Sequence, residues 1–308
     1  MKQEFIAGRD DAGRRFDVLL RRLLPSLGLS ALQKAVRRGD IRLNGQKASG
    51  EARIAEGDLI SVWDKLLSQN PHSDRKDRHS LLPPGAILFQ DKDFLVLNKP
   101  SGELVQAARS GEIALDERVR DYLAGTLSAS LSFRPGPLHR LDRFTSGVLV
   151  FSASLEGARH FSGALQSGLV SKEYLALLQG TLQTEVLVDA PLEREDGQVT
   201  TVADSGRSAR SLVTPLAVVA GRTLARVKIE TGRTHQIRAH CAHLGLPLAG
   251  DTRYGATRLA EGPVPWFLHA WRLNCPGLPP LVATVDPATS QWLQQSFQVF
   301  LPNTDHLR

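Results

Sequence analysis

The feature that most constrains the fold is a succession of short apolar runs in the chain after residue 85. The runs are bounded by turn-forming residues such as Gly, Pro, Asn and Asp, a pattern typical of β-strands. They cover residues 87–90, 94–97, 147–152, 174–178, 199–203, 211–219, 224–229 and 266–273. The helical patterns, at 115–123, 155–165, 234–243 and 290–297, do not alternate with the runs as βαβ units would. The sequence therefore predicts an α+β domain over 85–308 with a mixed, mainly antiparallel sheet.

A second, smaller unit is predicted over residues 1–63, with its core at 14–63. The expected elements are a helix over 16–24 that Pro25 ends, a helix from an N-cap at Ser30 to Gly39, and strands at 41–43 and 59–63. The Asn44-Gly45 pair is a strong tight-turn signal. Residues 64–84, polar and ending in two prolines, are expected to be a linker between the two units.

Positive charge is concentrated in the small unit. Residues 1–80 hold 16 of the 38 Lys and Arg and 11 of the 32 Asp and Glu, so most of the formal charge of +6 lies there. The second predicted helix carries Lys34, Arg37 and Arg38 on its polar face. So dense a patch suits a polyanion, because neutralising phosphates releases counterions. The alternative is a solvated basic surface with no partner.

The bulk composition restricts where the protein works. No segment approaches the roughly 18 apolar residues that a membrane span needs, and the first residues form no signal-peptide pattern. Cys241 and Cys275 lie far apart in sequence and suggest no disulfide framework. We therefore expect a cytoplasmic protein with no membrane partner.

A candidate site lies in residues 137–151, PLHRLDRFTSGVLVF. Asp142 stands between Arg140 and Arg143 just before a predicted buried strand. Two guanidiniums would keep that carboxylate ionised, as a functional site could require. A surface ion pair is the alternative.

Two other stretches carry reactive side chains. Tyr174 opens a predicted strand, where its hydroxyl could donate or accept a proton. Arg233 lies between Gly232 and Thr234, the predicted cap of the helix through His243, and could form a bidentate pair with a carboxylate. Without other information, the more common explanation for each is a structural residue with a local partner.

The nine residues at 139–147, HRLDRFTSG, resemble the HRLDxxTSG signature of the RluA-type pseudouridine synthases. Further blocks resemble those of the family in the same order; they are residues 98–102, 172–174, 232–238, 250–251 with 254–255, and 268–270. Together the blocks span about residues 86–276. The resemblance implies a pseudouridine synthase catalytic domain that isomerises uridine in RNA.

The resemblance also implies roles for individual residues. Asp142 matches the catalytic carboxylate, Tyr174 the tyrosine that stacks on the base and can accept a proton, and Arg233 the arginine that pairs with the carboxylate. Arg140 matches an arginine that approaches the vacated base stack or a phosphate. Whether the carboxylate adds to the base, attacks the sugar or assists elimination stays open.

The small unit resembles the α-L RNA-binding module, named after a small-subunit ribosomal protein. The match runs over about residues 14–63 and implies that Lys34, Arg37 and Arg38 contact RNA. The sequence departs from the family in two places: Gly28-Leu29-Ser30 stands where Ser-Arg-Ser is usual, and Asn274-Cys275-Pro276-Gly277 replaces a Phe-x-His-Pro element. Both departures concern RNA binding rather than the proposed chemistry.

We thus expect a monomeric RNA pseudouridine synthase, with ribosomal RNA of the large subunit favoured over transfer RNA as substrate. No cofactor is expected, and no metal, because the residues His235, His240, Cys241 and His243 lack a second spaced ligand pair. The alternatives are a noncatalytic RNA-binding or ribosome-assembly factor on the same fold, and a Ser/His/Asp hydrolase using Ser146. The hydrolase is disfavoured because no G-x-S-x-G motif surrounds Ser146.

Overall fold

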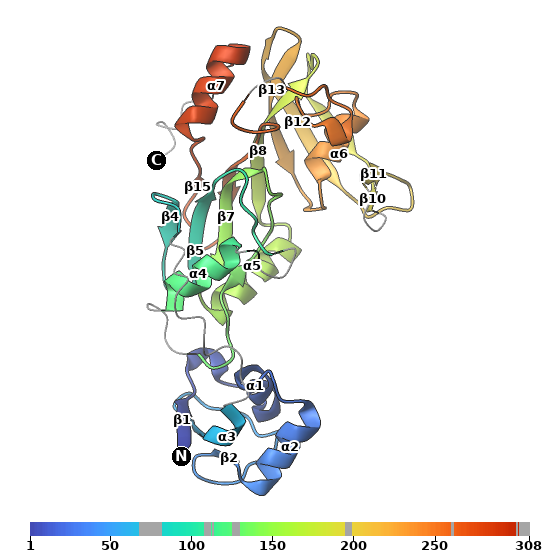
Figure 1. Cartoon of the computed structure of the whole chain (residues 1–308). Helices are drawn as coiled ribbons and strands as arrows, with labels where there is room; N and C mark the ends of the chain where they lie inside the picture. The colour runs from blue at the N-terminus through green and yellow to red at the C-terminus, as the bar shows by residue number, and fades with distance from the viewer. Residues whose placement is uncertain are drawn as a thin grey trace.

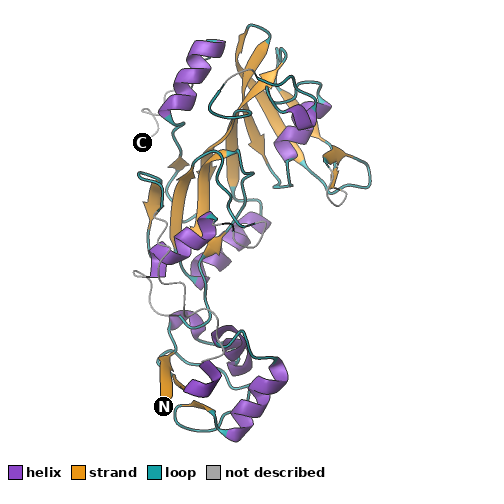
Figure 2. Cartoon of the chain, in the orientation of Figure 1, coloured by secondary structure: helices purple, strands orange, loops and turns teal. Residues whose placement is uncertain are grey.

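The computed structural model describes residues 1–67, 82–107, 112, 114–124, 130–194, 199–259, 262–299 and 301. These residues form a small N-terminal module and a large domain that carries an extended sheet (Figures 1 and 2). The module lies beyond the end of the large domain that carries α4 (Leu115–Ala124) and α5 (Leu155–Gln166). Among the described helices, none has the length and apolar character needed to cross a bilayer.

The N-terminal module packs two helices on a three-stranded sheet of order β1-β3-β2. Its elements are β1 (Lys2–Ile6), η1 (Arg9–Asp11), α1 (Phe16–Leu23), α2 (Leu29–Arg38), β2 (Ile41–Leu43), β3 (Leu59–Trp63) and α3 (Asp64–Leu67). Apolar residues at helical spacing, among them Leu19 on α1 and Leu32 on α2, are buried against Ile41 and Ile60 of the strands. Burial of this stripe leaves Lys34, Arg37 and Arg38 exposed on the outer face of α2.

The large domain is built on a mixed, mainly antiparallel sheet, as predicted. Its strand order is β4-β5-β7-β14-β8-β13-β12-β9, with β6 beside β7 and β15 beside β14. The strands are β4 (Ile87–Gln90), β5 (Phe94–Lys99), β6 (Gly136–Pro137), β7 (Ser146–Ser152), β8 (Ser171–Gln179), β9 (Val186–Asp189), β12 (Arg210–Val219), β13 (Arg222–Ile229), β14 (Leu268–Asn274) and β15 (Leu281–Val282). A separate hairpin pairs β10 (Leu192–Arg194) with β11 (Thr200–Val202).

Alternating residues of the strands face different helices. Leu95 and Leu97 of β5 face the cluster that includes residues of α4 and of α6 (Gln236–His243), whereas Phe94 and Val96 face the cluster with α5. The terminal helix α7 (Pro287–Phe297) covers apolar residues of β8 and β14. The sheet is therefore packed on both faces, and one face, with α4 and α6, carries the candidate site.

One parallel pairing occurs in the centre of the sheet. β7 and β14 run parallel, with Ser146 opposite His269 and Gly147 opposite Ala270. Gly147 has φ 106°, and a Cβ at this position would lie 2.2 Å from the carbonyl oxygen of Ala270. Only glycine allows the two backbones to approach this closely, so Gly147 fixes where the preceding loop leaves the sheet.

Several local predictions differ from the structure. α2 begins at Leu29 after Gly28, with no side-chain cap, so the predicted Ser30 cap is wrong. α6 begins after His235 rather than at a Thr234 cap. Asp64–Leu67 form a helical turn where the linker was expected to begin, and most of that predicted linker lies outside the described residues.

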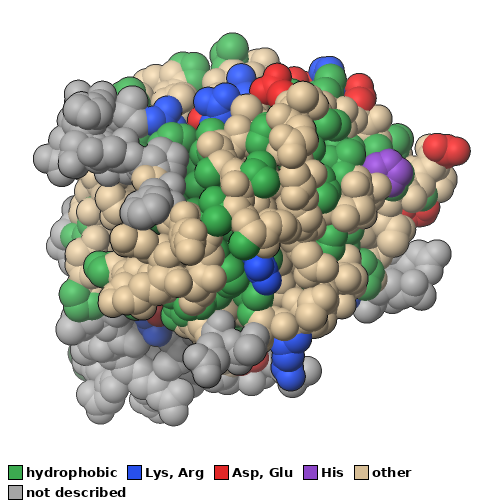
Figure 3. All heavy atoms as spheres, turned by 90° about the horizontal axis from the view of Figure 1, so that it is seen from above, with side chains coloured by type: hydrophobic (Ala, Val, Ile, Leu, Met, Phe, Trp, Pro, Cys, Tyr) green, Lys and Arg blue, Asp and Glu red, His purple; other side chains and the backbone are tan. Residues whose placement is uncertain are grey.

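The end of the molecule opposite the N-terminal module is seen in Figure 3. Hydrophobic side chains are interspersed there with separate groups of basic and acidic side chains. Among the described residues visible in this view, the basic side chains do not merge into one continuous surface.

Candidate active site

Asp142 lies in the loop between β6 and β7, and residues 99–102 hold this loop in place. The Gly102 amide donates to the Arg143 carbonyl oxygen at 2.9 Å, and the Ser101 hydroxyl donates to the Phe144 carbonyl oxygen at 2.9 Å. These bonds tie the start of β7 to the end of β5. The carboxylate of Asp142 stays 27% exposed, so a ligand can reach it.

Lys99 is the main support of this arrangement. Its fully buried Nζ donates to the carbonyl oxygens of Pro100, Glu103 and Arg143, each at 2.9 Å. Burial lowers the pKa of Lys99 to about 8, while the charges of Glu103 and Asp142 raise it. At neutral pH the ammonium therefore keeps the three protons that the three carbonyls require.

Two side chains at the start of α6 approach the carboxylate of Asp142. Arg238 Nη1 lies 3.7 Å from Asp142 Oδ2, and His235 Nε2 lies 3.9 Å from Asp142 Oδ1. Arg238 is held from the other side by a bidentate pair with the buried Asp251, at 2.6 and 2.9 Å. Its guanidinium also lies 4.3 Å from the Trp266 ring centroid and 4.8 Å from that of Tyr254. Arg238 is thus a fixed positive charge beside a carboxylate that keeps acceptor capacity for a substrate.

His235 holds an unusual backbone conformation at the start of α6. Its φ of 54° and ψ of 20° lie in the left-handed region, which costs a non-glycine residue free energy. The conformation brings Nδ1 within 3.0 Å of the Tyr254 hydroxyl while Nε2 faces Asp142. Burial lowers the pKa of His235, and the Asp142 charge opposes this shift.

Tyr174 lies near the start of β8 and lines the same cavity as Asp142. Its side chain is almost fully buried, and no described residue hydrogen-bonds its hydroxyl. Burial, followed by the charge of Asp142, raises the pKa of Tyr174, so the phenol stays neutral at physiological pH. A neutral phenol beside a carboxylate can stack on a base and exchange a proton with it.

The cavity that holds these residues has a volume of about 1020 Å³. That is ample for an extruded nucleoside with its flanking phosphates. Its charged lining comprises six cations against two anions: Arg140, Arg143, Lys172, Arg194, Arg233 and Arg238 against Asp142 and Glu230. The cavity thus suits a negatively charged ligand, with one carboxylate at the point of chemistry.

Lys172 is a cation of the cavity wall. Its side chain is almost completely buried, and it forms no hydrogen bond or ion pair with a described residue. Burial lowers its pKa. A Cβ on Gly232 would lie 3.5 Å from its Nζ, so the amine lies against the 229–232 segment of the cavity wall. An amine in the cavity wall that no described residue bonds is available for an anionic group of a ligand.

The structure brings some of the predicted residues together and separates others. Asp142, Tyr174, Arg140 and Arg233 all line the cavity, whereas Lys34, Arg37 and Arg38 lie on the N-terminal module. Arg233 Nε donates to the Ser208 carbonyl oxygen at 3.0 Å, and the arginine paired with Asp142 is Arg238 instead. Arg140 and Arg143 flank Asp142 in sequence, but the exposed Arg143 donates to the Gly102 carbonyl oxygen.

Sequence reasoning missed Arg238, His235 and Lys172 as individual site residues. A usable signal was present, because His235 and Arg238 are three residues apart on one predicted helix and therefore share a face. Lys172 belongs to the same block as Tyr174 and stands two residues before it, so the alternation of a strand places the two side chains on one face. Its burial follows from the neighbouring segment 229–232, which the sequence does not place.

Ser146, the residue of the hydrolase alternative, does bond a histidine. Ser146 Oγ lies 2.8 Å from His269 Nδ1, and His269 Nε2 donates to the Ala283 carbonyl oxygen at 3.0 Å. The carbonyl fixes the tautomer, so Nδ1 accepts the Ser146 proton. Neither residue lines the cavity, and the third partner is a carbonyl rather than a carboxylate. The pair joins β7 to β14 and does not form a catalytic triad.

His240 and Cys241 of α6 have structural roles. His240 Nδ1 lies 2.8 Å from Ser211 Oγ, and its Nε2 lies 3.0 Å from the Ala190 carbonyl oxygen. Burial raises the pKa of Cys241 to about 12, which keeps the thiol protonated. Among the described residues, no group of three or more His, Cys, Asp or Glu side chains is arranged to hold a metal ion.

Comparisons with known proteins assign this fold to a class of enzymes that modify bases in RNA. A sequence model described as RNA pseudouridylate synthase matches residues 93–243. The chain is 33% identical to "Ribosomal large subunit pseudouridine synthase D" of Xanthomonas campestris pv. campestris, over 82% of this chain and 74% of the relative. It is 31% identical to "Ribosomal large subunit pseudouridine synthase C" of Vibrio cholerae, over 85% and 84% respectively.

A solved structure agrees on the fold. "Human RNA Pseudouridylate Synthase Domain Containing 4" superposes with a TM-score of 0.59, at 24% identity, over 71% of this chain and 95% of that one. The chain belongs to the RNA pseudouridylate synthase family, and its activity is that of an RNA pseudouridine synthase.

Proposed function

We propose that this enzyme isomerises specific uridines of large-subunit ribosomal RNA and that Asp142 is its catalytic carboxylate. The observation that carries the proposal is the position of Asp142 in a basic cavity, 3.7 Å from a fixed arginine and facing the same space as Tyr174. The relatives named for large-subunit ribosomal RNA support this choice of substrate over transfer RNA.

The reaction breaks the bond between C1′ of the ribose and N1 of uracil and forms a bond from C1′ to C5. The proton on C5 is lost and N1 gains one, so the reaction is balanced as an isomerisation. Adding to the base, attacking the ribose and assisting elimination all require a charged carboxylate beside the junction of base and sugar. Asp142, partly exposed within the cavity, meets that requirement in each case.

Arg238 orients the carboxylate and stabilises its charge. Because its bidentate pair with Asp251 holds it before substrate arrives, no reorganisation is needed during the reaction. Tyr174 stacks on the uracil and exchanges the proton with the ribose or the base. The cationic residues Arg140, Lys172 and Arg233 hold the phosphates and oxygens of an extruded nucleotide.

The exposed basic face of α2 supplies a second contact with RNA in this proposal. Lys34, Arg37 and Arg38 point to solvent, where phosphates can reach them. The start of α2 lacks a capping hydroxyl because Gly28 precedes it, so the first turn offers only backbone N–H groups. We infer a monomer acting in the cytoplasm, where ribosomal RNA is found.

The purified chain with large-subunit ribosomal RNA and, separately, transfer RNA tests the proposal. Pseudouridines are mapped in each RNA after reaction with the wild type and with Asp142→Asn. We expect new pseudouridine in the ribosomal RNA only, and none with Asp142→Asn, whose RNA affinity is retained. The exposed carboxylate variant Asp121→Asn is the control and keeps full activity. Full activity of Asp142→Asn, or modification of transfer RNA alone, refutes the proposal.

A further inference from the structure

The N-terminal module meets the large domain at a fully buried carboxylate, that of Asp11 in η1. Its oxygens accept hydrogen bonds from three groups of the large domain at 2.9 Å, namely Ser130 Oγ, the Leu131 amide and the Ser132 amide. Ser132 Oγ adds a fourth bond at 2.5 Å, and the Gly8 amide of the module a fifth at 2.9 Å. Burial of a charge is tolerated only with such full hydrogen bonding, so this junction is a specific contact between the module and the large domain.

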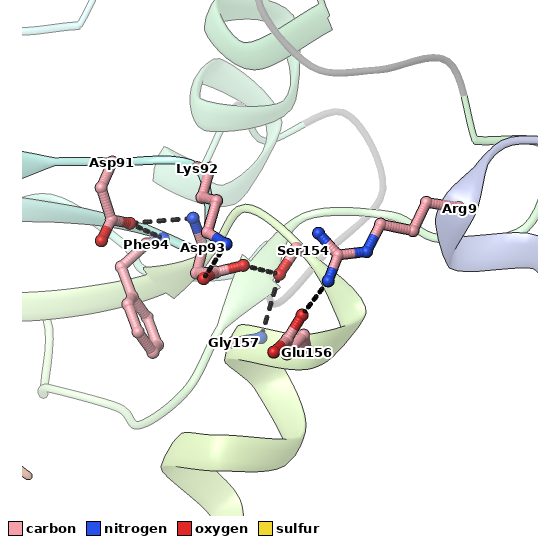
Figure 4. A network of polar contacts seen from close by, with 8 residues as sticks. All are labelled: Arg9, Asp91, Lys92, Asp93, Phe94, Ser154, Glu156 and Gly157. Carbon is pink, nitrogen blue, oxygen red and sulfur yellow. Dashed lines mark hydrogen bonds and ion pairs between the residues drawn. The ribbon is translucent and has the colours of Figure 1, made fainter. Parts of the chain in front are cut away.

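Other contacts surround this carboxylate. Arg22 Nη1 of α1 donates to the Ser132 carbonyl oxygen at 2.8 Å, and Leu131 packs against the apolar core of the module. An exposed ion pair joins Arg9 to Glu156 at 2.6 Å (Figure 4). The module therefore binds residues 130–132 through hydrogen bonds and apolar packing, and it also contacts the first turn of α5.

The first turn of α5 is itself firmly seated. Ser154 Oγ accepts from the Gly157 amide at 2.9 Å and donates to the Asp93 carboxylate at 2.5 Å (Figure 4). A Cβ on Gly157 would lie 2.3 Å from the Asp93 carbonyl oxygen, so the helix packs directly on the turn before β5. A module attached at this point takes a defined orientation relative to the catalytic sheet.

Positive charge gathers on both sides of the junction. Burial, and then the nearby charges of Arg22 and Arg159, lower the pKa of Arg14, with the charge of Asp11 acting in the opposite direction. Arg14 and Arg22 belong to the module, whereas Arg159 belongs to α5 and bonds no described residue. Three neighbouring guanidiniums with spare donors are suited to phosphate groups.

α5 leads from this junction to the cavity. Its 12 residues give a length of about 18 Å. Glu156 at its start contacts the module, whereas Leu165 and Gln166 at its end line the cavity. The junction and the wall of the cavity are therefore separated by about one helix length.

We propose that the Asp11 junction determines substrate selection by fixing the module at this distance from Asp142, with Arg14, Arg22 and Arg159 binding phosphates of the RNA between them. The proposal rests on the proposed action on ribosomal RNA. Asp11 is a positioning residue, because it acts through the module and not on the uridine. An RNA long enough to reach both sites benefits from the fixed geometry, whereas a short stem-loop that fills only the cavity does not.

The test compares kinetics on a long fragment of large-subunit ribosomal RNA with those on a short stem-loop carrying the same uridine. We expect Asp11→Ala to raise KM for the long RNA at least tenfold with kcat unchanged, and to leave the stem-loop kinetics unchanged. The double variant Ser130→Ala/Ser132→Ala removes donors from the other side of the junction and should have the same effects on KM and kcat as Asp11→Ala. Asp17→Ala, which removes a carboxylate paired with Arg15 inside the module, is the control.

Two measurements separate this proposal from the one on which it rests. Small-angle scattering of the free protein should show a larger radius of gyration for both junction variants than for the wild type. Arg159→Gln should weaken binding of the long RNA and lower the dependence of log Kd on log salt by about one, unlike the exposed Arg258→Gln. If the wild type is active and the junction variants leave KM for the long RNA unchanged, the junction proposal is refuted. Equal losses of activity on the long RNA and the stem-loop also refute it. An inactive wild type refutes only the choice of substrate, and scattering and RNA binding still decide the junction.

Discussion

The Arg238 guanidinium lies 3.7 Å from Asp142 while its bidentate hydrogen bonds go to Asp251, not to Asp142. The arginine is thus anchored by one carboxylate and presented to another. Asp142 gains the positive charge without having its oxygens fully occupied, and they stay available to the substrate. Anchoring by a buried partner also means that the arginine serves both stability and chemistry, and these two effects can be separated.

Arg238→Met should lower both the stability of the protein and the rate of the chemical step. Asp251 is fully buried and would lose its partner, which costs about 3–5 kcal/mol of unfolding free energy. The double variant Arg238→Met/Asp251→Asn removes both buried charges and should recover much of that stability. Single-turnover rates should remain at least about 100-fold below the wild type in the double variant, because the charge beside Asp142 is still missing. Urea unfolding and rapid-quench assays measure the two effects, and recovery of rate together with stability contradicts a role in the chemistry.

Arg233→Met is the matched comparison. Arg233 lines the same cavity, but it is partly exposed and bonds a backbone carbonyl. Its loss should leave the unfolding free energy within about 0.5 kcal/mol of the wild type. RNA affinity should fall, since a phosphate contact is removed. A rate loss as large as that of the Arg238 variants would show that Arg233 supports the carboxylate after all.

Tyr174→Phe should slow the chemical step by about 10²–10⁴-fold while RNA affinity is retained. The phenyl ring can still stack on the base, but the proton-exchanging hydroxyl is gone. Burial and the Asp142 charge raise the pKa of Tyr174, so its ionisation should cause no loss of wild-type activity between pH 7 and the ordinary tyrosine pKa near 10. Tyr122→Phe removes a hydroxyl bonded to Gln90 on the surface and should react at the wild-type rate.

Much of the fold could be predicted because its central strands are buried on both faces and read as continuous apolar runs. β7 was expected at 147–152 and is observed at Ser146–Ser152. Short strands such as β9, β10 and β15 were missed, since two to four residues are too few to show a strand pattern. Helix starts were less predictable, because α2 and α6 begin without the side-chain caps that a sequence reveals.

The sequence segments that form the site could be predicted, but the contacts between their side chains could not. Asp142, Tyr174 and Arg233 were expected to form one site, and all three line one cavity. Which arginine approaches the carboxylate depends on the direction of α6, whose first turn follows the left-handed backbone of His235. A positive φ at a histidine has no marker in the sequence. It could therefore not be foreseen that Arg238, and not Arg233, approaches Asp142.

Lys172→Met should weaken RNA binding and stabilise the free protein. A charged hydrogen bond contributes about 1.5–3 kcal/mol, so KM should rise by about 10- to 100-fold with little change in kcat. Without RNA the buried amine has no described partner, so replacing it by an apolar side chain of similar length should raise Tm. Lys228→Met, at an exposed position of β13, should change neither. A lower Tm with unchanged KM would assign Lys172 a structural role instead.

His269 should make the protein lose stability in mild acid. Its side chain is fully buried between Ser146 and Ala283, and burial lowers its pKa from 6.5 to about 4. The unfolded chain therefore binds the proton first, and between pH 6.5 and about 4 the unfolded state holds more protons than the native state. The contribution is fully present above pH 6.5 and decreases as pH falls through this window, by on the order of 3 kcal/mol in total. Urea titrations at a series of pH values measure it.

His269→Gln removes the titrating group but keeps a side chain able to hydrogen-bond, so its unfolding free energy should depend less steeply on pH between 6.5 and 4 than that of the wild type. His160→Gln is the control, because His160 is exposed on α5. Equal pH slopes for the wild type and His269→Gln would mean that the bond between β7 and β14 survives protonation of the imidazole. Survival would require the bond to reverse, with the imidazolium Nδ1–H donating to Ser146 Oγ, since an imidazolium has no acceptor nitrogen. The measurement therefore also tests the tautomer on which the structural assignment of the Ser146–His269 pair depends.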